Sequence, residues 1–105
     1  MISPDILTKA PAAFNASAAG TTSATIQFLS SGPAYAVIKD GTCTIHEGQA
    51  DKADLTIKAS DSNLVDLLIG KMKPAMGVMM GKISATGNLD LGLKLTSFFD
   101  FSRVT

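Results

Sequence analysis

The residues that most suggest a function are four methionines, Met72, Met76, Met79 and Met80. Their offsets of 0, 4, 7 and 8 residues would place them on one face of an α-helix. Because methionine is unbranched and polarizable, it adapts to apolar molecules of different shape. The group therefore predicts non-covalent binding of an apolar ligand. The alternative is that the same side chains fill an irregular core between a helix and a sheet.

The sequence offers little for covalent or metal chemistry. His46 is the only histidine, and it lies on the polar side of a predicted strand. The single cysteine, Cys43, has the opposite pleat parity and should face away from His46, and the side chain of the adjacent Glu47 also points the opposite way. We therefore expect a surface histidine, no catalytic residue, no metal site, no cofactor and no enzymatic activity.

Glycine and lysine stand together at Gly81 and Lys82, and a further glycine, Gly87, follows. This is not a phosphate-binding loop, because the Gly-x-x-x-x-Gly-Lys-Ser/Thr spacing is absent and Gly81 precedes a predicted strand rather than a helix. Both glycines are predicted to be chain turns. Lys71, Lys73 and Lys82 either belong to a solvated surface or meet a carboxylate or coenzyme A phosphates.

Composition limits the possible classes of protein. The chain of 105 residues is 46% hydrophobic and 17% charged, which is typical of one folded domain spanning residues 1–105. Its formal net charge is zero, with no run of either sign, so we expect no nucleic-acid partner. No stretch approaches the roughly 18 apolar residues of a membrane span, and no signal-peptide pattern opens the chain. With one cysteine, we expect a cytoplasmic protein without stable membrane insertion.

Hydrophobic periodicity predicts the elements of the N-terminal half. A helix should begin at residues 3–5, where serine can cap it and proline can occupy its first turn, and should be interrupted by Pro11. Patterns of period two then predict strands over residues 22–28, 34–39 and 42–47, the last two joined by an Asp-Gly turn. Strands connected so tightly must be antiparallel.

The C-terminal half combines strands and helices. A fourth strand is expected over residues 53–59 and a fifth over residues 83–86. Between them lies an apolar helical stretch, capped within residues 60–62 and interrupted near Pro74. The last segment alternates as a strand would, but it also fits a helix capped by Asn88, and we predict the helix. The pattern indicates a half-buried sheet with helices on one face.

The order of these features resembles the sterol carrier protein type 2 family. The resemblance is carried by Ala53-Asp54-Leu55 at the start of a strand, a helix led by Asp61, Gly70-Lys71 with Pro74, Met80-Gly81-Lys82 before the next strand, and Gly87 ahead of a leucine-rich end. Members of that family hold acyl chains, sterols or other apolar lipids in a tunnel. The resemblance implies an α+β fold with a five-stranded mixed sheet (three antiparallel strands, a crossover, a strand, helices, a strand), covered on one face by helices, with an apolar cavity between the layers.

The resemblance also implies a carrier that binds a fatty acid, a fatty acyl-CoA or a sterol-like molecule without enzymatic chemistry. The residues it implies for ligand contact are Ile26, Phe28, Leu64, Leu68, Met72, Met76, Met79, Met80, Phe98 and Phe99. Phe101 would anchor the tail of the chain. A charge at Met76 or Met80 is expected to abolish lipid uptake.

Two other classes of function fit the same fold. In one, the cavity is collapsed and the methionine and phenylalanine surface binds a partner protein or a second copy of the chain. In the other, the domain accompanies a lipid-metabolising enzyme and takes up only the substrate of that enzyme. The amino-acid sequence leaves these alternatives open.

Overall fold

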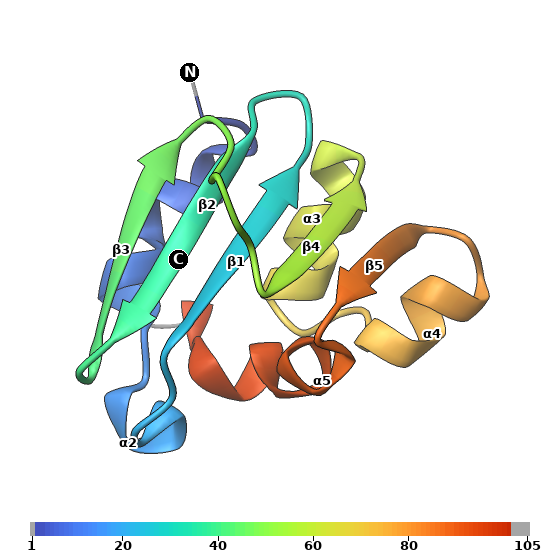
Figure 1. Cartoon of the computed structure of the whole chain (residues 1–105). Coiled ribbons are helices and arrows are strands. Elements are labelled where there is room, and N and C mark those ends of the chain that lie inside the picture. Colours follow the sequence, from blue (N-terminus) through green and yellow to red (C-terminus); the bar gives the residue numbers. More distant parts are fainter. Residues whose placement is uncertain (1, 102–105) are drawn as a thin grey trace.

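The computed structural model describes residues 2–101, with the side chain of Thr96 excepted. Its elements in chain order are η1 (Asp5–Lys9, a 3-10 helix), α1 (Ala10–Ala13), α2 (Ala16–Ala19), β1 (Ala24–Leu29), β2 (Ala34–Lys39), β3 (Thr42–Glu47), β4 (Leu55–Ala59), α3 (Asp61–Leu68), α4 (Pro74–Met79), β5 (Ile83–Gly87) and α5 (Leu89–Phe98). Figure 1 follows them along the chain. The predicted α+β class is confirmed.

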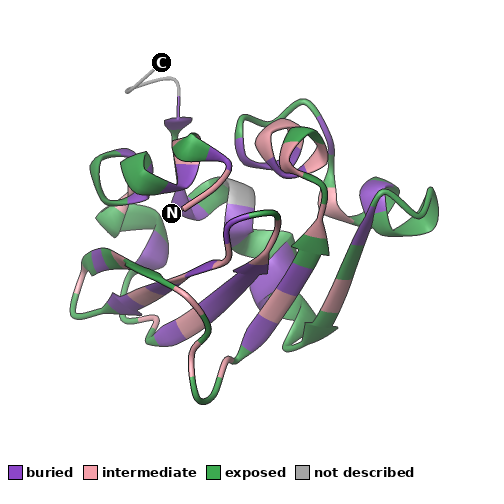
Figure 2. Cartoon of the chain, turned by 90° about the horizontal axis from the view of Figure 1, so that it is seen from above, coloured by how far each residue is buried: buried purple, intermediate pink, exposed green. Residues whose placement is uncertain are grey.

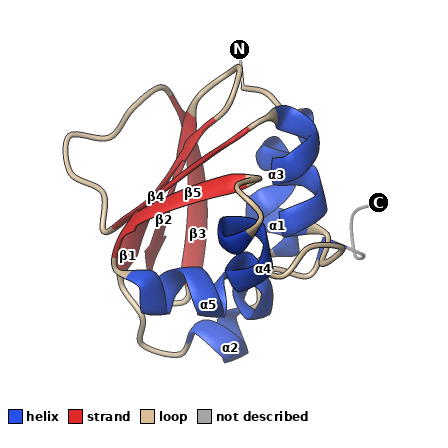
Figure 3. Ribbon diagram, turned by 90° about the vertical axis from the view of Figure 1, so that its right-hand side faces the viewer, coloured by secondary structure: helices blue, strands red, loops and turns tan. Residues whose placement is uncertain are grey.

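The five strands form one mixed sheet in the order β3-β2-β1-β4-β5. The first three strands pair antiparallel, as their tight turns predicted, whereas β4 lies parallel to β1 and β5 returns antiparallel to β4. The helices gather on one side of the sheet (Figure 3). Buried residues alternate with more exposed ones along the strands (Figure 2), because only one face meets the helices.

Two strands begin later than predicted, and a side chain closes the end of the β1–β4 ladder. β2 and β3 have the predicted bounds, but β1 begins at Ala24 and β4 at Leu55. Just before β4, Oδ2 of Asp54 accepts a hydrogen bond from the backbone N–H of Thr25 at 2.8 Å. The carbonyl oxygen of Thr25 accepts from the N–H of Asp54, also at 2.8 Å. Asp54 therefore ends the β1–β4 pairing.

The N-terminal segment differs from its prediction. Pro11 does not interrupt a helix but occupies the first turn of α1, where its missing N–H is not needed. Ser3 does not cap η1, because its hydroxyl donates instead to Oδ2 of Asp61 at 2.6 Å. η1 and α1 bury Leu7 and Ala13 completely, and α1 packs against β3. The segment thus covers the β3 end of the sheet.

Asp61 joins three segments that are distant in the sequence. It lies in the first turn of α3, and Ser60 caps that helix as predicted. Oδ2 of Asp61 accepts hydrogen bonds from the hydroxyls of Ser3 and Ser31, both at 2.6 Å, and Oδ1 accepts from the N–H of Ser31 at 3.0 Å. The bond from Ser3 and those from Ser31 hold the pKa of Asp61 below its ordinary value.

The last helix, α5, forms as predicted. Oδ1 of Asn88 caps it by accepting from the N–H of Asp90 at 3.1 Å. Leu91, Leu95 and Phe98 are buried on its inner side. Their spacing of four and three residues is that of one helical face, so the helical periodicity prevailed over the alternating one.

The end of α5 is fastened to the N-terminal segment. The N–H of Asn15 donates to the carbonyl of Phe98 at 2.6 Å, and the N–H of Asp100 donates to the carbonyl of Ala13 at 2.8 Å. Phe101 beyond them is 2% exposed, as an anchoring residue would be. These two hydrogen bonds therefore join the C-terminal end of the described chain to its N-terminal helices.

Gln27 lies on the face of the sheet away from the helices, yet it is only 4% exposed. Its Nε2 donates to the carbonyls of Ala34 and Gly48 at 3.1 and 3.0 Å, and its Oε1 accepts from the N–H of Ala50 at 2.7 Å. These bonds satisfy the amide, so its burial costs little. They hold the loop before β4 over the sheet.

Replacing Gly87 with alanine should cost about 3 kcal/mol of stability, since φ is +102° and the new Cβ would overlap the carbonyl oxygen of Asp54. Gly48 is the matched control, because its φ is +97° but a Cβ there meets no atom within 4 Å. Gly48→Ala should therefore carry only the backbone strain, about 1–2 kcal/mol. Urea unfolding measures both, and equal losses would contradict the close approach at Gly87.

Asp61→Asn should destabilise the protein at neutral pH, and the difference should vanish in acid. The folded state lowers the pKa of Asp61 below its ordinary 3.8, so ionised Asp61 stabilises the fold above that value. This contribution is lost as the pH falls through the lower pKa of the folded state. Urea unfolding at pH 7 and at steps below about pH 4 tests the prediction. The control is Asp51→Asn in an exposed bend. A difference that is constant with pH would contradict it.

Candidate functional site

The four methionines do not share one helical face, and that prediction was wrong. α4 begins at Pro74, whose ring suits the first turn of a helix but obstructs a preceding turn. Met72 therefore lies in the connection before α4 and is 9% exposed. Met76, Met79 and Met80 project from α4 and its C-cap and are 56%, 84% and 60% exposed.

Met72 and the six other residues expected to contact ligand belong to the buried core. The six are Ile26, Phe28, Leu64, Leu68, Phe98 and Phe99, none more than 4% exposed. Burial of such a side chain contributes about 1.5–3 kcal/mol, so these residues hold the sheet and the helices together. The structure thus brings seven of the ten expected residues together and leaves three on the surface.

Apolar side chains from α4, β5 and α5 line a surface hollow of about 340 Å³, which we term the α4–α5 groove. Its lining residues are Pro74, Ala75, Val78, Ala85, Leu89, Gly92 and Leu93. Val78, Leu89 and Leu93 are 47%, 58% and 62% exposed. Sites for small molecules are concave, mostly apolar and about 300–1,000 Å³ in volume. The α4–α5 groove is therefore the candidate functional site.

Gly77 allows α4 to lie close to the sheet. A Cβ on this residue would come within 3.0–3.1 Å of the side chains of Ile83 and Met72. A Cβ on Gly92 of α5 would lie 3.7 Å from the side chain of Leu55, which is an ordinary contact. Because Gly77 has no side chain, α4 approaches the strand directly. The groove is consequently shallow, with β5 as its floor.

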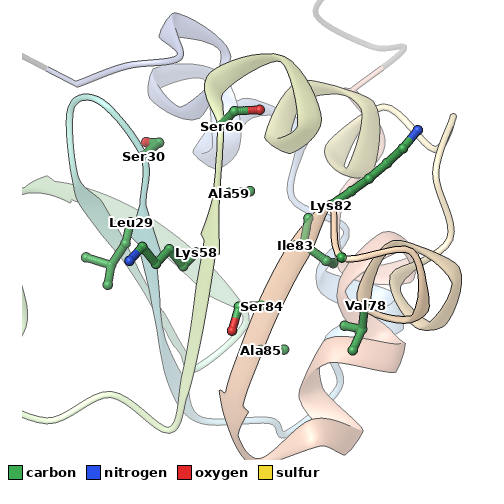
Figure 4. Close-up of a pocket in the computed structure, with 11 residues that line it drawn as sticks. Leu29, Ser30, Lys58, Ala59, Ser60, Val78, Lys82, Ile83, Ser84 and Ala85 are labelled. Carbon is green, nitrogen blue, oxygen red and sulfur yellow. The ribbon is translucent and has the colours of Figure 1, made fainter.

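A second, open hollow of about 700 Å³ adjoins the groove and shares Val78 and Ala85 with it. Figure 4 shows Leu29 and Lys58 on one side of this hollow and Val78 of α4 on the other. The remaining lining is Ser30, Ala59, Ser60, Gly81, Lys82, Ile83 and Ser84. Two lysines and three serines thus lie beyond the apolar groove along β5.

A third hollow, of about 310 Å³, lies between the end of α3 and residues 97–101. Leu68 and Phe99, two of the residues expected to contact ligand, line it. Asn15, Ser97 and Asp100 line it as well, so it is less apolar than the α4–α5 groove. It suits an apolar ligand less well.

Sequence reasoning missed the groove residues on α5. Leu89 and Leu93 are four residues apart, so they share the outer face of α5, whereas Leu91 and Leu95 share its inner face. Leucines on both faces are more than a surface helix needs to pack against its core. That excess is the signal in the sequence that could have pointed to the outer face of α5.

Cys43 and His46 face apart, as their opposite pleat parity predicted. Cys43 is buried and His46 is exposed, on opposite faces of β3. The ring of His46 stacks on Tyr35 at 5.0 Å and its Nε2 lies 3.0 Å from Oγ1 of Thr44. Among residues 2–101, no three His, Cys, Asp or Glu side chains gather as metal ligands would. Within the same range, no helix is long and apolar enough to cross a membrane.

Burial raises the pKa of the Cys43 thiol from 9.0 to about 11, which leaves it protonated at neutral pH. Each unit of pKa is a factor of ten in thiolate, so at pH 8 the folded protein should react with iodoacetamide about 100-fold more slowly than in urea. Mass spectrometry of the alkylated protein follows the reaction. Equal rates in the folded and unfolded protein would contradict the burial of Cys43.

The chain matches the family model described as SCP-2 sterol transfer family over residues 7–100. It is similar to sterol carrier protein 2 from Oryctolagus cuniculus, with 40% identity over 58 residues. That match covers 55% of this chain but 11% of the relative, so the chain spans only a small part of the length of such relatives.

Two solved structures share the fold. Sterol carrier protein 2 from Yarrowia lipolytica, in its apo form, has a TM-score of 0.70 and 18% identity, covering 90% of this chain and 84% of that one. An inverting sec-alkylsulfatase from Pseudomonas sp. has a TM-score of 0.83 and 16% identity, covering 94% of this chain and 16% of the sulfatase chain. With the family match covering nearly its whole length, the chain belongs to the SCP-2 sterol transfer family.

Proposed function

We propose that this domain binds and carries a single-chain apolar lipid in the α4–α5 groove, without enzymatic chemistry. Membership of the family indicates lipid binding or transfer. The observation that carries the finer proposal is that every lining residue of the groove is apolar while three of its large side chains are about half exposed or more. Large exposed apolar patches on a folded domain mark sites that another molecule covers.

The size of the groove favours a slender ligand. Its volume of about 340 Å³ is near the lower end of the range for small-molecule sites. Burying about a dozen methylenes at about 0.8 kcal/mol each gives roughly 10 kcal/mol. Subtracting the smallest expected association cost, about 4 kcal/mol, leaves a dissociation constant that is at best in the tens of micromolar. A fatty acid or fatty acyl-CoA fits this description better than a sterol-like molecule.

The adjoining hollow offers a place for a polar head group. Lys58 lines it with three serines, whereas the groove itself has no polar side chain. Because the two hollows share Val78 and Ala85, a ligand along β5 would cross from an apolar to a polar surface. We assign the acyl chain to the groove and the carboxylate or phosphate to the end of the hollow that Lys58 and the serines line.

A longer ligand would have to separate the helices from the sheet. Met72 lies directly behind Gly77 of α4, so it is the first core residue that such a ligand would reach. Ile26, Phe28, Leu64, Leu68, Phe98 and Phe99 lie deeper in the same core. The tunnel implied by the family resemblance is therefore part of this proposal: it would open by displacement of α4 and be lined by these residues.

The second candidate function is that of a domain that accompanies a lipid-metabolising enzyme. The rabbit relative and the sulfatase chain are both several times longer than this chain, which covers 11% and 16% of them. In that setting the groove would hold the substrate of a neighbouring catalytic domain. Selective rather than broad lipid uptake would favour this candidate.

Leu93→Glu is expected to weaken fatty-acid binding at least tenfold, because it places a carboxylate in the groove. Leu93→Met is the matched control and should bind as the wild type does. Displacement of a fluorescent fatty acid measures affinity, and circular dichroism verifies that each variant is folded. Leu93 is 62% exposed, so neither change should unfold the domain.

The variant Met80→Glu tests whether the ligand binds in the groove or on the exposed methionines. Met80 is 60% exposed and is not among the groove residues, so we now expect its replacement to leave uptake unchanged, in contrast to the expectation from helical spacing. Unchanged binding by Leu93→Glu would overturn the placement of the ligand in the groove. Loss of fatty-acid binding in Met80→Glu but not in Leu93→Glu would instead indicate that the ligand binds at the exposed methionines.

A further inference from the structure

The outer face of α4 is an apolar surface that the groove does not use. Met76, Met79 and Met80 lie at offsets of 0, 3 and 4 residues, so their side chains share one side of this short helix. Their exposed fractions are 56%, 84% and 60%. Val78 points to the groove instead, and Gly77 faces the sheet. The three methionines therefore form a separate surface, which we term the outer methionine face.

The position of α4 makes this face protrude. α4 lies beyond the edge strand β5, at the opposite end of the molecule from β3 (Figure 1). It packs on β5 and α5 through its other sides. Three large apolar side chains on one exposed turn are unfavourable in water, and surfaces of this kind contact a membrane or a partner.

Three lysines flank the outer methionine face along the chain. Lys73 is the N-cap of α4, Lys71 precedes it by two residues, and Lys82 follows its C-terminal end, all of them exposed. Residues 67–89 contain these three lysines and no aspartate or glutamate. Since the whole chain has nine basic and nine acidic residues, this segment carries +3 and the rest of the chain −3. The three methionines therefore lie in a positively charged segment of a chain whose formal net charge is zero.

We propose that the outer methionine face docks on the surface of an anionic phospholipid bilayer. The methionines would enter the boundary between head groups and acyl chains, and Lys71, Lys73 and Lys82 would contact the anionic head groups. Lysine is depleted at the centres of protein–protein interfaces, whereas its long aliphatic stem suits the rim of a membrane contact. The combination of apolar tip and lysine rim thus favours a bilayer over a protein partner.

Such docking would bring the α4–α5 groove to the membrane. Val78 lines the groove from the same helix that carries the methionines, so the two surfaces are adjacent. A lipid leaving the bilayer would then meet the groove without crossing open water. Docking does not depend on which lipid the groove holds, so it can fail or succeed independently of the proposed carriage.

The test is sedimentation of the full chain with vesicles. One set contains phosphatidylcholine alone and the other contains phosphatidylcholine with about one quarter phosphatidylglycerol. The wild type should bind the anionic vesicles at low salt and be released as salt screens the lysines. Each Lys→Gln change at positions 71, 73 or 82 should weaken binding about fivefold. Lys39→Gln and Lys52→Gln, at exposed sites outside this segment, are the controls and should have a much smaller effect.

The variant Met79→Glu tests the apolar contribution to vesicle binding separately from the contribution of the lysine charges. It should weaken vesicle binding at least tenfold, whereas Met79→Leu should preserve it. Uptake of a fluorescent fatty acid in solution should be the same in both variants, because Met79 is not among the groove residues. This readout verifies that each variant is folded and tests carriage separately from docking.

Three results would overturn the docking proposal. The first is wild-type binding that is equal for both vesicle sets, and the second is full binding by Met79→Glu. The third is absence of vesicle binding, and gel filtration would then show whether the face joins two copies of the chain. Loss of fatty-acid uptake in Leu93→Glu with intact vesicle binding would support carriage and docking as separate properties.

Discussion

The parallel contact between β1 and β4 is the interaction on which the rest of the structure depends. It is the seam between the antiparallel β3-β2-β1 unit and the β4-β5 pair with its helices. Asp54 closes the seam with its side chain and backbone on Thr25, and its carbonyl also accepts from the N–H of Asn88 at 2.7 Å. Asp54 thus fixes the end of the parallel ladder and the start of α5. Glycine is required at residue 87 because any side chain there would meet the carbonyl oxygen of Asp54.

The position of the candidate site depends on this β1–β4 pairing. β5 is placed at the edge of the sheet by its pairing with β4, and α4 and α5 both rest on it. Because Gly77 lacks a side chain, α4 lies close to β5, and the groove lies between α4 and α5. The core behind the groove is filled by large apolar residues, so a ligand larger than one acyl chain would have to displace α4.

α4 is the element that relates the proposed functions to each other. It is short, begins at a proline, and lies between a buried methionine and an outer face of exposed ones. One side lines the groove, one packs on β5, and one carries methionines at the centre of a lysine-bearing segment. A helix with few buried contacts is also the part of a fold that opens most easily, which suits an entrance for lipid.

The sequence by itself determined the strands, the caps of α3 and α5 and the mixed α+β class, because period-two alternation, Asp-Gly turns and Ser or Asn caps act within a few residues. It also carried the family resemblance, through short motifs at Asp54, Gly81 and Gly87. Tertiary structure decided which apolar residues became core and which became surface. The methionines at residues 72–80 were separated by Pro74, and Leu89 and Leu93 were left uncovered, because the position of α4 against β5 and α5 depends on contacts between distant segments. Helical spacing describes one element, whereas burial is a property of the whole packed chain.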